Sequence, residues 1–522
     1  MPPNQPQIAK VIMGSLFALV VILGVLSFIA PPSLFPDPAN GFLVMRSMEL
    51  GGKFNMMVTP DQDDFSKNAS EFLTWWSPGQ YLVPYAFKLL FGVNSGQGST
   101  LTVLLCQLLG LSGFYCFFKK VGFTPFIAAL SMLFIACQQF FVVPYVFYNG
   151  GEILSFAFTG WFLYGCVAFK KPSWQMVVFI LFSGWIGFFC KSSTMWVFAA
   201  GLLFIWIRLS SSKELGDWIK NGIWIAIPAI IAIAAIYIFF LSKGQNPASA
   251  SAGLKLTLKT FAFPLASPLL SGFSIDDICH GLIYHTGKVI FNDWQSIAIL
   301  ILLAILGLWL VRSILKKVTD PNYRLLVIIF YTVSFLFFSY VYLMQKAISY
   351  EARHFRVIGL LVIPGVVNLV SQLKNPYRHI LCVLWAGIAF TSIFYLVKGY
   401  RFNKNKSAHG VSGIAQQSID QTALNKVLAL DQQVRNATFV FVNKELGLEI
   451  QHNRVLGLEP IGNDLKIDME DYEYDGHAGP LYIILPDSYA GPKEKFILKS
   501  FPAYKGWYGD KLSDGYVMYK AL

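Results

Sequence analysis

The chain of 522 residues is 55% hydrophobic and 16% aromatic, and only 13% of its residues are charged, against roughly 25% in an ordinary soluble protein. Residues 1–400 contain 41 charged side chains and residues 401–522 contain 29, so the shortage of charge lies in the first part. This composition excludes a soluble enzyme and predicts a membrane domain, residues 1–400, followed by a soluble domain, residues 401–522. The net charge of +12 arises within the apolar part, so no nucleic-acid partner is expected.

Apolar runs of about 20 residues, long enough to cross a bilayer, occur eleven times. They lie at 9–30, 99–118, 123–143, 151–169, 173–190, 193–209, 219–241, 294–313, 323–344, 356–372 and 378–398. Lysines and arginines gather in the loops on one side, which predicts that this side is cytoplasmic. A multi-pass protein of the plasma (inner) membrane follows, with the tail on the periplasmic or extracellular side.

The longer outer segments are where we expect chemistry. Segment 31–98 is the predicted catalytic loop, and it contains two short helices typical of the membrane interface, Gly41–Leu50 and Gln80–Phe91. The stretch 244–272 is rich in Ser, Ala, Gly and Pro and is expected to be a mobile loop.

Alternating and periodic patterns in the tail predict a small α/β domain. The expected elements are helices near 413–434 and 493–500 and strands at Thr438–Val442, Leu481–Leu485 and Tyr516–Tyr519.

Metal ligands are not indicated by the seven cysteines, which all precede residue 400 and lack zinc-type spacing. Asp61, Asp63 and Asp64 could hold a divalent cation through carboxylate oxygens. The glycine and distal glutamate of a calcium loop do not follow, so a solvated turn is favoured.

Two acidic residues lie at the outer ends of predicted spans. Asp37, in Pro36-Asp37-Pro38, directly follows the first span, where it could take a proton from a substrate or cap a helix. Glu152 begins the fourth span. An ionisable residue at the edge of a span could serve a function, or the helix dipole could simply stabilise an acid at this N-terminus.

Basic and aromatic candidates lie in two further outer segments. Arg353, His354 and Arg356 open the tenth span, where guanidinium groups suit bidentate phosphate binding. Ordinary anchoring to lipid headgroups is the alternative. Trp75 and Trp76 could line a sugar site or belong to an aromatic belt.

The order of these features resembles the GT-C superfamily of membrane glycosyltransferases, such as protein O-mannosyltransferases and the lipid A aminoarabinose transferase. Asp37 matches the first acid of that family, Asn40–Gly52 its amphipathic helix, and Ser77-Pro78-Gly79-Gln80-Tyr81 its proline-rich element. Lys119 and Lys120 end the following span, and Glu152 occupies the region of the second polar position. Arg353-His354 with Pro364 resembles the late Arg-Tyr element. A single acid replaces the Asp-Glu pair of some members, Ser-Pro replaces Pro-Pro, and His354 replaces the tyrosine.

The resemblance implies inverting transfer of one sugar from a polyprenyl-phosphate donor to an acceptor hydroxyl. It assigns Asp37 as the base and Glu152 as the group that orients the sugar or the acceptor. Residues expected to bind the donor phosphate are Arg353 and His354, and more weakly Arg356 and Lys88. Residues expected to line the substrate are Trp75, Trp76 and Tyr81. No cofactor or metal is required by this scheme, and membrane lipids are the remaining partners.

Two other functions remain as alternatives. An O-antigen polymerase or ligase also spans the membrane many times, but such proteins usually lack a soluble terminal domain. A transporter usually places charges in the middle of its spans and often contains inverted repeats, whereas the charges here gather at the outer ends.

Overall fold

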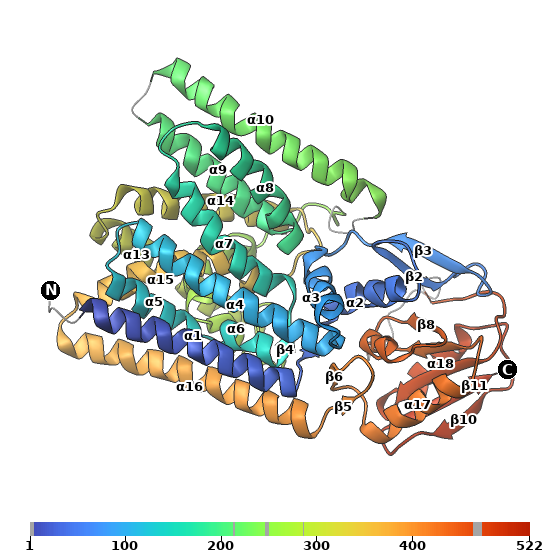
Figure 1. Cartoon of the computed structure of the whole chain (residues 1–522). Coiled ribbons are helices and arrows are strands. Elements are labelled where there is room, and N and C mark those ends of the chain that lie inside the picture. The colour runs from blue at the N-terminus through green and yellow to red at the C-terminus, as the bar shows by residue number, and fades with distance from the viewer. Residues whose placement is uncertain (1–4, 212–213, 246–249, 286, 463–471, 522) are drawn as a thin grey trace. The chain divides into compact units, whose positions relative to one another are not determined.

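The computed structural model describes residues 5–211, 214–245, 250–285, 287–462 and 472–521. The chain forms two compact units. The first comprises Met1–Leu23, Val103–Pro144 and Gly151–Val397, and the second comprises Gly24–Thr102, Tyr145–Gly150 and Lys398–Leu522. Figure 1 labels the helices and strands of both units.

Long apolar helices make up the first unit and continue into the second. Among the described residues, eight helices are long and apolar enough to cross a membrane. They are α1 (Gln5–Ile29), α4 (Ser95–Lys120), α7 (Gly151–Ala168), α10 (Leu215–Phe239) with its short extension to Lys243, α13 (Asp293–Lys317), α14 (Pro321–Leu343), α15 (Arg356–Ser371) together with the preceding short helix η4 (Ala352–Phe355), and α16 (Asn375–Asn405).

The three other predicted spans are helical too, but they are shorter or bent. The helices α8 (Trp174–Cys190) and α9 (Thr194–Ser210) have 17 residues each. The helix α5 (Pro125–Ala136) meets the stretch Gln139–Tyr145, which contains α6 (Gln139–Val142), at an angle of 72°. Every predicted apolar run therefore forms a helix, which confirms a polytopic helical membrane protein.

Local sequence signals fix where several of these helices begin. The side chain of Thr124 accepts a hydrogen bond from the Ile127 amide at the start of α5, and Asp320 does the same for the Tyr323 amide at the start of α14. A proline follows each cap, where the missing N–H costs nothing.

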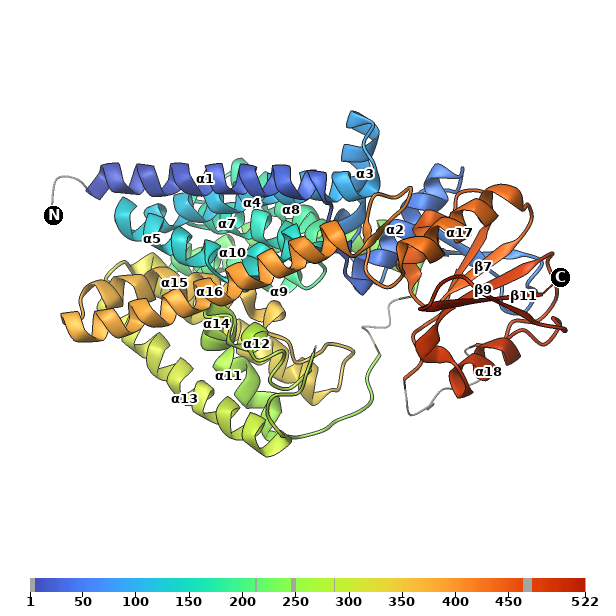
Figure 2. The ribbon, with the colours of Figure 1, turned by 90° about the horizontal axis from the view of Figure 1, so that it is seen from below.

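Residues 258–272 form a helix, so the predicted mobile loop is wrong for this part. The helix α11 (Leu258–Gly272) contains Pro264 and Pro268 and packs against α13, α14 and α15 (Figure 2). Phe263 and Leu270 on this helix are completely buried. Burial against three neighbouring helices outweighs the low helix propensity of proline. Residues 246–249 of the expected loop lie outside the described residues.

In the second unit, the first outer segment contains both short helices that the sequence predicts. Its elements are β1 (Ser33–Leu34), α2 (Pro36–Glu49), β2 (Met56–Pro60), β3 (Asn68–Phe72) and α3 (Gly79–Phe91), and the separate stretch 145–150 adds β4 (Phe147–Tyr148). Strand β1 pairs in parallel with β4, and β2 pairs in antiparallel with β3. A side chain at Gly41 of α2 would lie 2.1 Å from the Tyr81 ring of α3, so the close approach of these helices requires glycine there.

The tail is a small α/β domain, as predicted, built on a five-stranded sheet in the order β10-β11-β9-β7-β8. Strand β7 runs parallel to β8 and β9, whereas β11 runs antiparallel to β9 and β10. The tail elements are β5 (Ala408–His409), β6 (Ala415–Gln416), α17 (Gln421–Gln433), β7 (Thr438–Phe441), η5 (Lys444–Glu449), β8 (Arg454–Gly457), β9 (Leu481–Pro486), α18 (Pro492–Lys499), β10 (Tyr508–Lys511) and β11 (Tyr516–Ala521).

Alternation along the central strands creates two hydrophobic cores, one on each face of the sheet. Phe439 packs with α17 residues such as Leu424, while the next residue, Val440, packs with Ile497 of α18. Phe65, from the first outer segment, is completely buried in this second core. The first outer segment and the tail thus share a core, which no local pattern in the sequence indicates.

Candidate functional site

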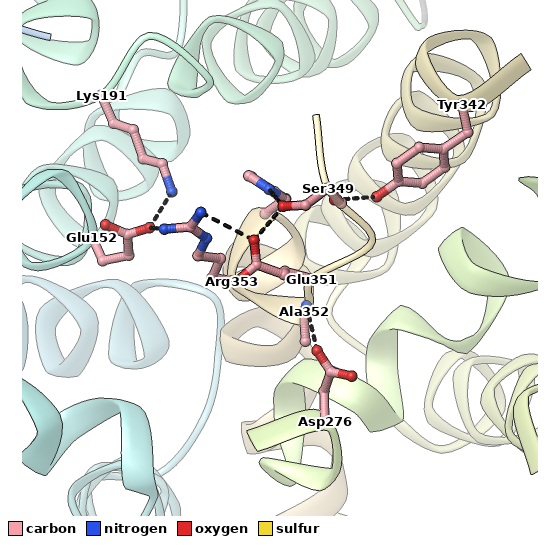
Figure 3. A network of polar contacts seen from close by, with 9 residues as sticks. Glu152, Lys191, Asp276, Tyr342, Ser349, Glu351, Ala352 and Arg353 are labelled. Atoms are coloured by element: carbon pink, nitrogen blue, oxygen red, sulfur yellow. Dashed lines mark hydrogen bonds and ion pairs between the residues drawn. The ribbon is translucent and has the colours of Figure 1, made fainter. Parts of the chain in front are cut away.

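Four charged side chains of the first unit form one cluster, which we call the ionic cluster: Glu152, Lys191, Glu351 and Arg353 (Figure 3). One carboxylate oxygen of Glu152 lies 2.7 Å from Lys191 Nζ and 3.4 Å from Arg353 Nη1. The other terminal nitrogen of Arg353, Nη2, lies 3.0 Å from a carboxylate oxygen of Glu351. Two cations and two carboxylates therefore balance one another within a chain of ion pairs.

Helix ends position the ionic cluster. Glu152 lies in the first turn of α7 and Lys191 is the residue that caps the C-terminus of α8. An acid at a helix N-terminus and a base at a C-terminus are both stabilised by the helix dipoles. Arg353 lies in the short helix η4 (Ala352–Phe355), which immediately precedes α15.

Burial of the ionic cluster carries a cost in solvation free energy. The side chains of its four residues are between 11% and 24% exposed. Charges removed from water lose several kcal/mol of solvation each, and ionisable groups in membrane helices usually serve a function. The cluster is therefore the strongest candidate site in the first unit.

His354 lies beside this cluster rather than within it. Its Nε2 atom is 3.5 Å from Ser349 Oγ, and Ser349 donates a short hydrogen bond to Glu351. Among the described residues, its Nδ1 atom is buried and has no hydrogen-bond partner. Its ring packs against Phe338 with centroids 6.1 Å apart.

Asp276 supports the turn that carries the ionic cluster. It lies in α12 (Ile275–Ile278), and one carboxylate oxygen accepts a hydrogen bond from the Leu282 amide at 2.9 Å. The other accepts a hydrogen bond from the Ala352 amide at 2.8 Å (Figure 3). Burial raises the pKa of Asp276 to about 6, although both amide hydrogen bonds act in the opposite direction.

Arg356 is held by other partners. Its guanidinium donates to the Ser271 carbonyl at 3.0 Å, lies 3.3 Å from the Asp277 carboxylate, and stacks on the Phe140 ring at 4.2 Å. These contacts tie the start of α15 to the end of α11. Phosphate binding by Arg356 stays a prediction.

Asp37 lies in the second unit, in the first turn of α2. The helix begins at Pro36, and Phe35 occupies the cap position without a side-chain cap bond, so Asp37 is not the cap residue. Asp37 instead lines a cavity of about 410 Å³, which it shares with Asn40 and Trp76 and with residues of the tail.

The other predicted residues of the second unit have different surroundings. Lys88 on α3 forms an ion pair with Glu49 on α2 at 2.5 Å. Tyr81 is completely buried, and its hydroxyl donates a short hydrogen bond to Asn55. Because Tyr81 has no exposed surface, its expected place along the substrate stays a prediction.

The tryptophan pair is more accessible. The Trp75 and Trp76 rings have centroids 5.6 Å apart, and Trp75 is 41% exposed. Trp76 lines the same cavity as Asp37, a position compatible with the predicted contact to a sugar.

The acidic cluster Asp61, Asp63 and Asp64 forms a turn. Asp61 accepts hydrogen bonds from the amides of Asp63 and Asp64 at 3.0 Å each, and Asp64 pairs with Lys67 at 2.8 Å. Throughout the described part of the chain, no group of three or more His, Cys, Asp or Glu residues is arranged to hold a metal ion.

Sequence reasoning missed two members of the ionic cluster. Lys191 and Glu351 each lie between or beside predicted spans, where a charged residue is unremarkable. A basic residue at the outer end of one span, opposite an acid opening the preceding span, is the signal that could have found Lys191.

Comparisons with known proteins give likeness in structure alone. No protein-family model matches the chain, and no curated protein matches it. Among solved structures, ArnT from Cupriavidus metallidurans bound to undecaprenyl phosphate is 13% identical, with a TM-score of 0.49 over 97% of both chains. The arabinofuranosyltransferase AftD from Mycobacteria is 12% identical, with a TM-score of 0.46 over 97% of this chain and 41% of that chain.

The oligosaccharyltransferase of Archaeoglobus fulgidus is 11% identical, with a TM-score of 0.43 over 96% of this chain and 72% of that chain. Likeness at this level assigns no role to any residue.

Proposed function

We propose that the protein is a membrane glycosyltransferase that transfers one sugar from a polyprenyl-phosphate donor to an acceptor hydroxyl at the outer face of the plasma membrane. The observation that carries this proposal is the ionic cluster, because two cations at the ends of apolar helices suit a phosphate attached to a lipid. The sequence resemblance supports the same reaction.

Phosphate binding requires the ionic cluster to exchange partners. Its two cations are already balanced by two carboxylates, so an incoming phosphate must replace a carboxylate contact. The contact between Arg353 and Glu152 is the longest in the cluster, at 3.4 Å, and is therefore the weakest. Arg353 and Lys191 can turn toward a phosphate oxygen while Arg353 keeps its bond to Glu351.

The proposed reaction is a single displacement at the anomeric carbon. The acceptor oxygen bonds to that carbon while the bond from the carbon to the phosphate oxygen breaks, and the electron pair leaves with the polyprenyl phosphate. The Asp37 carboxylate takes the hydroxyl proton. Arg353 and Lys191 stabilise the negative charge that develops on the departing phosphate, and Glu152 orients the sugar.

A reconstituted assay tests the proposal. The purified full-length protein is mixed with a panel of polyprenyl-phosphate-linked radiolabelled sugars and a membrane extract as the source of acceptor. We expect release of polyprenyl phosphate and labelling of an acceptor with one donor, both lost in Arg353→Ala while Asp293→Asn, an exposed charge change on α13, keeps them. Retention of full turnover in a folded Arg353→Ala protein would exclude this function for the cluster.

A further inference from the structure

The cavity beside Asp37 lies wholly within the second unit, and its chemistry indicates what kind of molecule fills it. Its volume of about 410 Å³ falls within the range of roughly 300–1,000 Å³ that is usual for small-molecule sites. Its lining includes the start of α2 and, from the tail, residues 417–418 and 443–445. The helices α2 and η5, which carry several of these residues, pack against each other.

Hydroxyl-rich ligands suit the neutral groups in this cavity. Asn40, Asn443 and Gln417 contribute amides to the lining, and Ser418 contributes a hydroxyl. Gln417 Nε2 donates to Asn403 at 2.8 Å and Ser418 Oγ donates to Glu445, so these two side chains offer their oxygens as acceptors to sugar hydroxyls. Trp76 adds a flat aromatic surface, which can cover the apolar face of a sugar ring. A mixture of small polar groups around one aromatic ring is a typical lining for a saccharide.

The charges of the cavity discriminate between acceptors. Three carboxylates, Asp37, Glu445 and Glu459, line it against a single cation, Lys444. Lys444 already forms a close ion pair with Glu459. The Glu445 carboxylate receives a hydrogen bond from Ser418 Oγ at 3.0 Å, and burial raises its pKa. Among the residues that line the cavity, carboxylates therefore outnumber cations, and a phosphate or carboxylate on the ligand would meet repulsion worth several kcal/mol.

We propose that this cavity is the acceptor subsite and that it takes an uncharged saccharide or an amino sugar, to the exclusion of phosphorylated or acidic glycans. This inference rests on the proposed function, because Asp37, the assigned base, lines the same cavity. The acceptor is thereby a neutral or cationic carbohydrate with a free hydroxyl.

Direct binding tests the proposal without turnover. Detergent-purified full-length protein is applied to a glycan array that presents neutral, amino, carboxylated and phosphorylated oligosaccharides, and the Kd of the best ligand is measured by calorimetry. We expect binding to neutral or amino glycans, weakened about tenfold by Glu445→Gln through the lost charge-assisted hydrogen bond. Glu473→Gln, which neutralises an exposed carboxylate of the tail outside the cavity lining, should bind like the wild type.

The charge reversal Glu459→Lys provides a second test, which does not depend on whether Glu445→Gln folds. Glu459 has a side chain 67% exposed, so Glu459→Lys should preserve the fold, and it should permit binding of phosphorylated glycans that the wild type rejects. Preference of the wild type for anionic glycans, no glycan binding at all, or an array pattern unaltered by Glu459→Lys would each overturn the inference. Selective glycan binding without transfer from any polyprenyl-phosphate donor would instead contradict the proposed function and leave the acceptor subsite standing.

Discussion

Replacing Glu152 with glutamine should strengthen the binding of polyprenyl phosphate while lowering turnover. Glu152 is the shared partner of Lys191 and Arg353, at 2.7 and 3.4 Å. A phosphate that binds these cations must compete with the Glu152 carboxylate. The neutral amide of glutamine competes less, because it keeps the shape but not the charge of the carboxylate.

The size of the effect follows from the contacts that are exchanged. A hydrogen bond to a charged group contributes about 1.5–3 kcal/mol net. Glutamine retains an acceptor oxygen and the side chains are partly exposed, so the lower end of this range applies, which corresponds to about tenfold in Kd. Turnover should fall, because Glu152 is the group proposed to orient the sugar.

Calorimetry with polyprenyl phosphate in detergent micelles measures this affinity, and thermal unfolding gives a second measurement. The Glu152→Gln protein should unfold at a lower temperature than the wild type without ligand, because two buried cations lose their carboxylate. Polyprenyl phosphate should then raise its unfolding temperature by more than it does for the wild type. Asp293→Asn controls for the change in net charge. Weaker phosphate binding in Glu152→Gln would refute the competition between carboxylate and phosphate.

Three further predictions concern other parts of the chain. Asp37→Asn should lower turnover by about 10²–10⁴-fold, as the loss of a general base does, while donor affinity stays unchanged; near-normal turnover would remove Asp37 from the reaction. Because the pKa of Asp276 is about 6 in the folded protein against an ordinary value of 3.8, the folded state binds the proton more tightly, and stability should fall by about 2–3 kcal/mol as the pH rises from about 4 to about 7. Thermal unfolding across this range should show the slope in the wild type and not in Asp276→Asn. Reporter fusions after Lys171 and Lys404 should give cytoplasmic and outer signals respectively, and the same side for both would contradict eleven spans.

Long apolar runs made the helical part of the fold predictable. Each run of about 20 apolar residues forms a helix, because a chain in a bilayer must satisfy its backbone hydrogen bonds internally. The helix α11 escaped prediction because Pro264 and Pro268 break the local signal, and its stability comes from neighbours far away in sequence. The tail strands were predictable because the period-2 pattern at Phe439 and Val440 is local, whereas the burial of Phe65 among them is not.

The candidate site was predictable only in its separate parts. Glu152 and Arg353 were each predicted as candidate site residues because they are charged and lie at the ends of spans. They are 201 residues apart in the sequence, and no local pattern indicates that they form an ion pair. Lys191, 39 residues from Glu152, was overlooked for the same reason. Ion pairs between helices depend on how the helices pack, which a single sequence does not specify.

Opposite charges give the proposed enzyme a means of distinguishing its two substrates. The ionic cluster offers cations that can exchange a carboxylate for a phosphate, which selects a donor bearing a negative charge. The cavity beside Asp37 carries an excess of carboxylates, which disfavours the same phosphate and favours a neutral hydroxyl compound. Repulsion between a phosphate and these carboxylates would leave the cavity to the acceptor hydroxyl, whose proton Asp37 is proposed to take.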